Sequence, residues 1–154
     1  MKSQSKNYSK LYISLTEAIE TFISEVKKHN LRDMATDEWT VKDIFRHLAY
    51  WHTYYAQNYS SLAKGSKPFV FKSKGGSTRN QDGVDSLKNK SQKELEAMLN
   101  KAQKSLYQSI VIKEVPKMNY IEHSEYKTKD FLEMITGHIQ RHTLQVKRAK
   151  KVNK

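Results

Sequence analysis

The sequence predicts an all-α protein, and three observations support this prediction. Four segments place apolar residues at three- and four-residue steps, which is the spacing of one face of a helix. Pro68 and Pro116 both fall between these segments, where they interrupt no helix. The length of 154 residues suits one domain with a substantial core. Together these observations favour a four-helix bundle that forms a single domain over residues 1–154.

The first two helices are expected over about residues 8–28 and 40–62. The apolar stripe of the first consists of Leu11, Leu15, Ile19, Phe22, Ile23 and Val26. The second opens with a capping box, because Thr40 can accept from the backbone at Asp43 while the Asp43 carboxylate bonds back to the backbone at Thr40. Its stripe continues through Ile44, Leu48, Trp51 and Tyr55.

The third and fourth helices are expected over about residues 91–110 and 128–149. Ser91 and Glu94 form a second capping box, followed by an apolar stripe through Leu95, Met98, Leu99, Ala102 and Leu106. The fourth helix carries Asp130 in its first turn, where a negative charge is favourable.

The connection between the second and third helices covers about residues 64–90 and holds most of the glycines. It is long enough to run the length of a bundle, so these two helices can be parallel with a long crossover, whereas the first two should be antiparallel. Residues 69–71, "FVF", suit a short extended piece. Connections of this length in compact domains are usually functional or disordered.

Charge and composition limit the possible partners and the compartment. The chain has 28 Lys and Arg against 16 Asp and Glu, a formal net charge of +12. An anionic partner is one interpretation, but the lysines are spread along the chain, which favours a solvated surface and a frayed basic tail over about residues 149–154. There is no cysteine, so a metal site must use His, Asp or Glu. With no apolar leader and no membrane-spanning run, we expect a cytoplasmic protein.

His138 and His142 lie one turn apart in the fourth predicted helix, within "TGHIQRHTLQ". At about 100° per residue they fall on one line with Phe131, Ile135 and Ala149, at the centre of the apolar stripe. They are either hydrogen-bonded core residues or ligands of a divalent cation, since two histidines one turn apart are a recurring chelate. The neighbouring Gly137 would let another group approach closely.

A metal site requires a third ligand, and the second helix offers His47 and His52. The two lie on opposite sides of the apolar stripe by similar angles, so periodicity does not choose between them. "HIQRH" lacks the glutamate of the HExxH motif, which excludes the mechanism in which that glutamate acts as base. His29 and His123 are expected to be solvated.

The stretch "WTVKDIFRHLAYWH", followed by "FLEMITGHIQRH", resembles the DinB/YfiT-like metalloenzyme superfamily. The stretches "YKTKDFLEMITGHIQRH" and "STRNQDGVDSL" are most similar to its ClbS/DfsB-like four-helix-bundle branch. The resemblance covers about residues 10–148 and implies an up-down-down-up topology. It also implies a divalent metal, typically nickel or zinc, held by His47, His138 and His142, whereas His52 matches no ligand of the family.

The resemblance also implies a metal-dependent enzyme of stress or detoxification type, with three histidines leaving open positions on the metal. Relatives include transferases that use a low-molecular-weight thiol cosubstrate, and hydrolases that act on small electrophiles. Trp51, Tyr54 and Tyr55, with Tyr50, are candidates for an aromatic substrate pocket, although each also suits the core. We expect a small-molecule substrate, allow for a homodimer, and expect neither a specific nucleic acid nor a membrane as partner.

Two other classes of function remain open. One is a non-catalytic protein that binds or sequesters a small molecule within the bundle. The other is a nucleic-acid binder driven by the net charge, which is disfavoured because the chain shows no helix-turn-helix, no RNP-like strand and no zinc finger.

Overall fold

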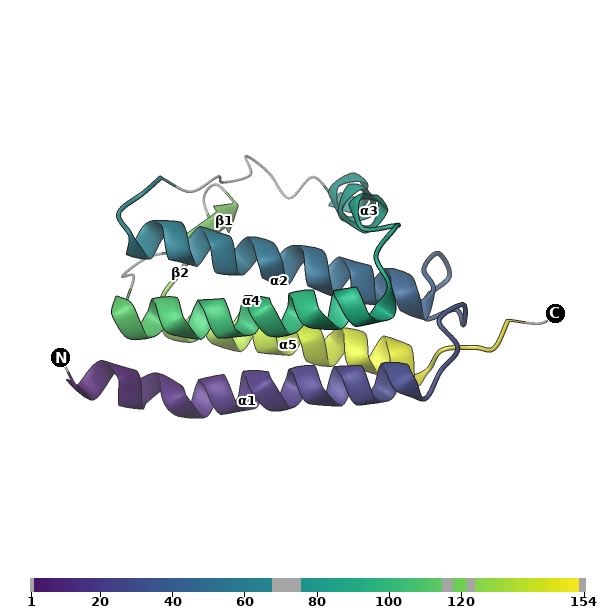
Figure 1. The fold of residues 1–154 in the computed structure, drawn as a ribbon, viewed down its shortest axis with the longest axis horizontal. Helices are drawn as coiled ribbons and strands as arrows, with labels where there is room; N and C mark the ends of the chain where they lie inside the picture. Colours follow the sequence, from purple (N-terminus) through teal and green to yellow (C-terminus); the bar gives the residue numbers. More distant parts are fainter. Residues whose placement is uncertain (1, 68–75, 115–117, 122–123, 153–154) are drawn as a thin grey trace.

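The computed structural model describes residues 2–67, 76–114, 118–121 and 124–152 (Figure 1). These residues are mainly helical, as the sequence predicts. The described helices are α1 (Lys2–Lys27), α2 (Val41–Ala63), α3 (Gly76–Ser86), α4 (Gln92–Ile112) and α5 (Thr128–Lys147). A short antiparallel pair, β1 (Met118–Ile121) and β2 (Ser124–Tyr126), precedes α5.

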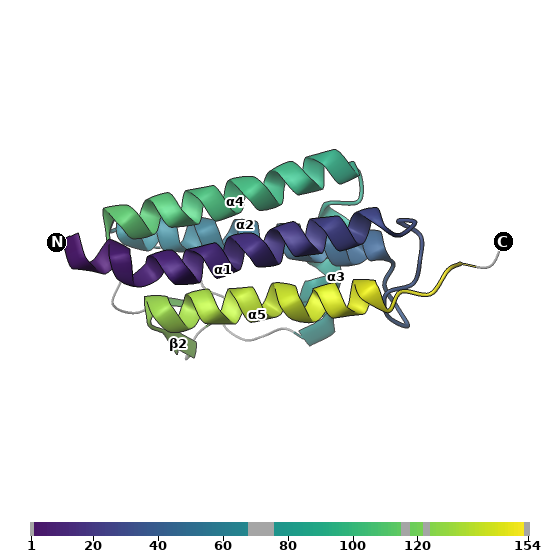
Figure 2. The same cartoon turned by 90° about the horizontal axis from the view of Figure 1, so that it is seen from below.

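The four long helices lie side by side, with α3 outside them over α2 (Figures 1 and 2). The most extensive packing joins α2 to α4 and α1 to α5, and smaller contacts join α1 to α4 and α2 to α5. In Figure 1, α2 and α4 run in one direction while α1 and α5 run in the other. The end of α2 and the start of α4 therefore lie toward opposite ends of the long helices.

The buried faces of α1, α2 and α4 follow the predicted apolar stripes. Ile19, Phe22, Ile44, Leu48 and Leu99 are all at most 1% exposed. Both predicted capping boxes form, at Thr40 with Asp43 and at Ser91 with Glu94. Each box satisfies backbone N–H groups that have no partner within the helix, which fixes the residue at which α2 or α4 begins.

Helix α3 corrects the expectation that residues 64–90 form only a connection. Its sequence, GSTRNQDGVDS, has almost no apolar face, and Val84 is its one apolar side chain among the buried residues described. Tertiary contacts hold it instead. The indole N–H of Trp39 donates to Gln81 Oε1 at 2.9 Å, and that of Trp51 donates to Asn80 Oδ1 at 3.0 Å. The extended piece expected at 69–71 lies outside the described residues.

The segment after α5 is also better ordered than a frayed tail. Helix α5 ends at Lys147, and Lys150 then exchanges two backbone hydrogen bonds of 2.9 Å with Met34 in the link between α1 and α2. Ala149 packs against the core. The prediction of a free basic tail from about residue 149 was therefore wrong as far as Lys150.

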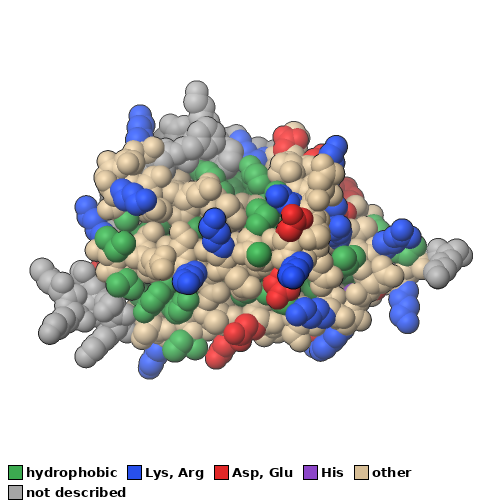
Figure 3. Space-filling model, viewed as in Figure 1, with side chains coloured by type: hydrophobic (Ala, Val, Ile, Leu, Met, Phe, Trp, Pro, Cys, Tyr) green, Lys and Arg blue, Asp and Glu red, His purple; other side chains and the backbone are tan. Residues whose placement is uncertain are grey.

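The positive charge is dispersed over the face of the molecule that Figure 3 shows. In Figure 3, Lys and Arg side chains are scattered over the visible face and are interspersed with Asp and Glu. Among the described residues, no helix combines the length and the apolar character that crossing a membrane requires.

Candidate metal centre

Histidines from α2 and α5 meet in a buried cluster between these two helices. His138 Nε2 lies 3.0 Å from His47 Nε2 and 3.2 Å from His142 Nε2. His52 Nε2 lies 3.3 Å from His138 Nδ1. His47 and His52 are each 5% exposed and His142 is 9% exposed, while His138 is partly buried.

The side of α5 that carries the histidines is not the centre of its buried face. Leu132, Ile139 and Val146 are at most 1% exposed, and they rotate the buried face by roughly 60° from the predicted line, at 100° per residue. The prediction that the histidines occupy the centre was therefore wrong. Helix α5 packs mainly on α1, so its apolar face is turned to α1 and its histidines lie at the edge that faces α2.

Gly137 does not provide close approach to the cluster. It is exposed, and a Cβ built there would meet no atom within 4 Å. The expectation that the missing side chain admits another group next to the histidines is therefore wrong.

The hydrogen-bond partners of the outer ring nitrogens define the state of the cluster. A neutral imidazole has one N–H and one lone pair, so the partner of one nitrogen fixes the role of the other. His142 Nδ1 lies 2.6 Å from Gln145 Oε1; when this oxygen accepts from His142, the His142 proton is on Nδ1 and its Nε2 carries a lone pair. His52 Nε2 likewise accepts from the His138 ring when His138 carries its proton on Nδ1.

When Gln145 accepts from His142, neutral histidines do not supply a well-directed hydrogen to every Nε2 contact. With the His142 proton on Nδ1, His138 Nε2 faces two other Nε2 atoms. Each of these two contacts requires one hydrogen, carried by only one of its two nitrogens. If His47 donates to His138, two lone pairs face each other across the 3.2 Å contact. If His138 donates from Nε2, its one hydrogen is shared between His47 and His142. The proton of His47 then stays on its buried Nδ1, which has no partner among the described residues.

A divalent cation resolves this conflict because all three Nε2 lone pairs can point to it. Candidate ligand atoms of His47, His138 and His142 all lie within 4.8 Å of one another. Two nitrogens that bind one ion tetrahedrally at 2.0–2.1 Å are separated by roughly 3.3 Å. The observed contacts of 3.0 and 3.2 Å are close to that separation. The donor set fits a metal of the zinc or nickel class, which favours imidazole nitrogen.

The surroundings keep the imidazoles neutral, which is the form that binds metal. Burial lowers the pKa of His47 to about 3, and the neighbouring His142, His52 and Arg141 act in the same direction. Burial, with His142, also lowers the pKa of His52 to about 3. The pKa values of His138 and His142 are lowered as well, first by burial.

The aromatic candidates for a substrate pocket belong to the packing of α2. Trp51 and Tyr55 are 6% and 4% exposed and are members of the hydrophobic core, and Tyr54 packs against it. Tyr55 contacts the His52 ring at a centroid distance of 5.3 Å. These side chains support the histidines from behind. A substrate role for Trp51, Tyr54 and Tyr55 remains a prediction.

A hollow of about 390 Å³ reaches the cluster from the outside. It is lined by His142 and Gln145 of α5, Asn80 of α3 and link residues 36–39. Trp39 is the residue that sequence reasoning missed, since its ring lies 5.0 Å from that of His47. Its position directly before the capping residue Thr40 was visible in the sequence, but the fold of the link was not.

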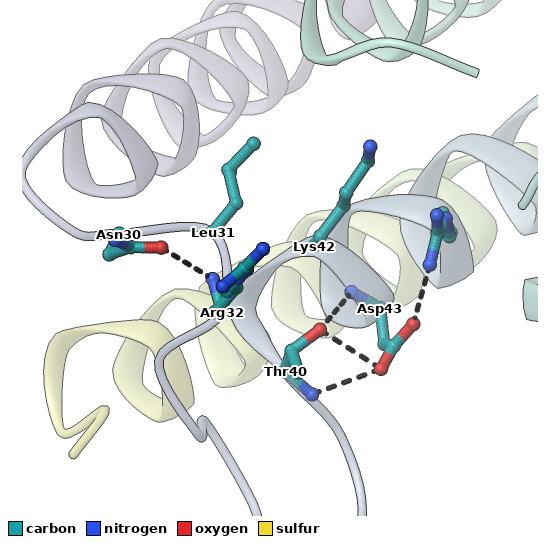
Figure 4. Close-up of a pocket in the computed structure, with 7 residues that line it drawn as sticks. Asn30, Leu31, Arg32, Thr40, Lys42 and Asp43 are labelled. Atoms are coloured by element: carbon teal, nitrogen blue, oxygen red, sulfur yellow. Dashed lines mark hydrogen bonds and ion pairs between the residues drawn. The ribbon is translucent and has the colours of Figure 1, made fainter. Parts of the chain in front are cut away.

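A larger hollow of about 510 Å³ lies at the start of α2 and is not lined by histidine (Figure 4). Its polar groups already bond one another. Asp43 accepts from Thr40 and from Arg46 Nη1 at 2.9 Å, and Asn30 Oδ1 accepts from the backbone N–H of Arg32. We therefore place the candidate site at the smaller hollow.

No protein-family model, curated protein or solved structure matches this chain. The resemblance to the DinB/YfiT-like superfamily thus rests on the sequence motifs at residues 39–52 and 131–142, and the candidate metal centre rests on the geometry of the histidines.

Proposed function

We propose that this chain is a divalent-metal-dependent enzyme of the DinB/YfiT-like type, built as an up-down-down-up four-helix bundle, with one ion held by His47, His138 and His142. One observation is the main support. The three buried Nε2 atoms converge to 3.0 and 3.2 Å, and with Gln145 accepting from His142 Nδ1, neutral imidazoles supply no separate hydrogen to each contact. A cation removes that conflict without protonating groups whose pKa burial has lowered.

Two further residues hold the proposed ligands in position. Gln145 accepts from His142 Nδ1, and His52 accepts from His138 Nδ1, so each Nε2 is left free to bind. Such second partners fix the tautomer and the ring orientation of a ligating histidine. His52 is therefore a positioning residue in this proposal and not a ligand.

A bound zinc or nickel ion would supply Lewis acidity and an activated water or thiolate at its open positions. The protein would position a substrate in the hollow against His142 and keep solvent from the inner face of the cluster through Trp39. The reaction we propose is transfer or hydrolysis on a small electrophile, with a low-molecular-weight thiol as the cosubstrate in the transfer case.

The second candidate is a non-catalytic protein that sequesters a small molecule, because the same hollow can hold a ligand without converting it. Turnover of model electrophiles, with and without metal and thiol, separates the two. Metal-dependent loss of the electrophile supports the enzyme, whereas stoichiometric binding without product supports sequestration.

Metal content tests the site directly. The protein purified without a histidine tag and loaded with zinc should hold about one ion per chain by elemental analysis, and His47→Ala should lose most of it. His52→Ala should keep the stoichiometry but bind roughly 10–100-fold more weakly. His29→Ala is the matched control, because His29 lies beside Glu25 and Asp33 outside the cluster. Equal zinc in wild type and His47→Ala would refute the assignment.

A further inference from the structure

The hollow that reaches the cluster is acidic, although the chain as a whole is strongly basic. Asp37 and Glu38 line it, and both are exposed and form no ion pair with a described residue. Across Trp39 lies a second hollow of about 360 Å³, which shares Glu38 and Trp39 and adds Asp82. Among the described residues, neither hollow has a Lys or Arg in its lining, in a chain of net charge +12.

Trp39 lines both hollows and brings an aromatic ring to them. Its indole N–H is committed to Gln81 Oε1 at 2.9 Å, which fixes the ring. The face of a tryptophan attracts cations, and carboxylates on either side strengthen that preference. Arg141 and Arg79 are adjacent in sequence to lining residues but line neither hollow, although the charge of Arg141 acts on the pKa of His142.

The hollow also reaches a proposed metal ligand. His142 lines it and is 9% exposed. Asn80 and Gln145 add polar side chains beside it. The hollow therefore combines the buried His142 with two carboxylates and the ring of Trp39.

We propose that this hollow selects small molecules that carry a positive charge, such as an ammonium group, and disfavours anionic ones. The inference rests on the proposed metal site, since the ligand would reach the ion past His142. The cation would lie between the carboxylates of Asp37 and Glu38 and the face of Trp39. A thiol or electrophile that enters here is then cationic or neutral, not acidic.

The test uses coordinating probes that differ in the charge of their side chain. Cobalt(II)-loaded protein is titrated at low ionic strength with histamine, 4-methylimidazole and imidazole-4-acetate, and binding is followed by the cobalt d–d absorption. The variant Asp37→Asn/Glu38→Gln removes the acidic wall. The matched control Glu17→Gln/Glu20→Gln removes the same charge from exposed positions of α1.

Histamine should bind the wild type more tightly than imidazole-4-acetate, and the ratio of their affinities should fall by about tenfold in Asp37→Asn/Glu38→Gln, because nearby exposed carboxylates act through a screened Coulomb interaction. Comparing variants cancels the different basicities of the rings. The control variant should keep the wild-type ratio. Cobalt binding with an unchanged ratio in Asp37→Asn/Glu38→Gln would overturn this inference alone. Failure to bind cobalt would overturn the metal site and this inference together.

Discussion

Without metal, the buried histidines should make the fold sensitive to mild acid. His47 and His52 have pKa values of about 3 in the fold, and those of His138 and His142 are also lowered, whereas an unfolded histidine titrates near 6.5. Below about pH 6.5, these histidines are therefore protonated in the unfolded chain but stay neutral in the folded chain. The stability is fully present above pH 6.5 and is lost as the pH falls from 6.5 toward the folded values.

The magnitude follows from the number of histidines. Between pH 7.5 and 5.5, a group that titrates at 6.5 when unfolded and stays neutral when folded costs about 1.4 kcal/mol of unfolding free energy. The result depends little on the folded pKa, provided that it lies well below 5.5. His47 and His52, whose folded pKa values are about 3, together cost about 3 kcal/mol, and the lowered pKa values of His138 and His142 add to this loss, which is a large share of the stability of a typical domain.

Urea unfolding followed by circular dichroism at pH 7.5, 6.5 and 5.5, with chelator present, measures this loss. His52→Leu should reduce it by about 1.4 kcal/mol, because the contribution of one titrating group is gone. The control His29→Gln should leave it unchanged, since His29 lies outside the cluster. A total loss below about 1.4 kcal/mol would mean that the cluster is protonated in the fold, and would refute the reasoning.

Other predictions follow from the same structure. Zinc should raise the melting temperature at pH 7.5 by binding only the folded state, and the gain measured by thermal melts should shrink below about pH 6.5. Gly137→Ala should stabilise by about 0.5–1 kcal/mol in urea unfolding because the position is helical and open, whereas Gly83→Ala should destabilise because its Cβ would lie 2.6 Å from the Tyr50 ring. Thr40→Ala should cost about 1 kcal/mol by removing the cap of α2. Duplex DNA should bind weakly and lose its affinity between about 50 and 200 mM salt in fluorescence anisotropy; sequence-specific binding would contradict this.

The parts of the fold that were predictable are those that short-range chemistry specifies. Capping boxes at Thr40 and Ser91, together with apolar periodicity, located the start and the course of α2 and α4. Helix α3 was not predictable in this way, because hydrogen bonds from two distant tryptophans hold it and its own apolar face is almost absent.

The histidines that meet in the cluster were predictable as a group, but their setting was not. The spacing of His138 and His142 allowed either a chelate or a pair of core histidines, and the resemblance, not periodicity, singled out His47; that these three bind a metal stays a prediction. Periodicity could not show that His52 contacts Nδ1 of His138, because that contact depends on how α2 and α5 are rotated relative to each other. The hollow beside Trp39 depends on the path of a link that has no periodic pattern.

Both tryptophans of the chain donate their indole N–H groups to neighbouring residues of one short helix, Asn80 and Gln81 of α3. The intrinsic fluorescence of the protein is therefore an optical report on the seating of α3 against α2 and the link. Departure of α3 would expose both indoles at once and shift the emission to longer wavelength. The protein thus carries a built-in probe, at the entrance to its histidine cluster, that needs no added label.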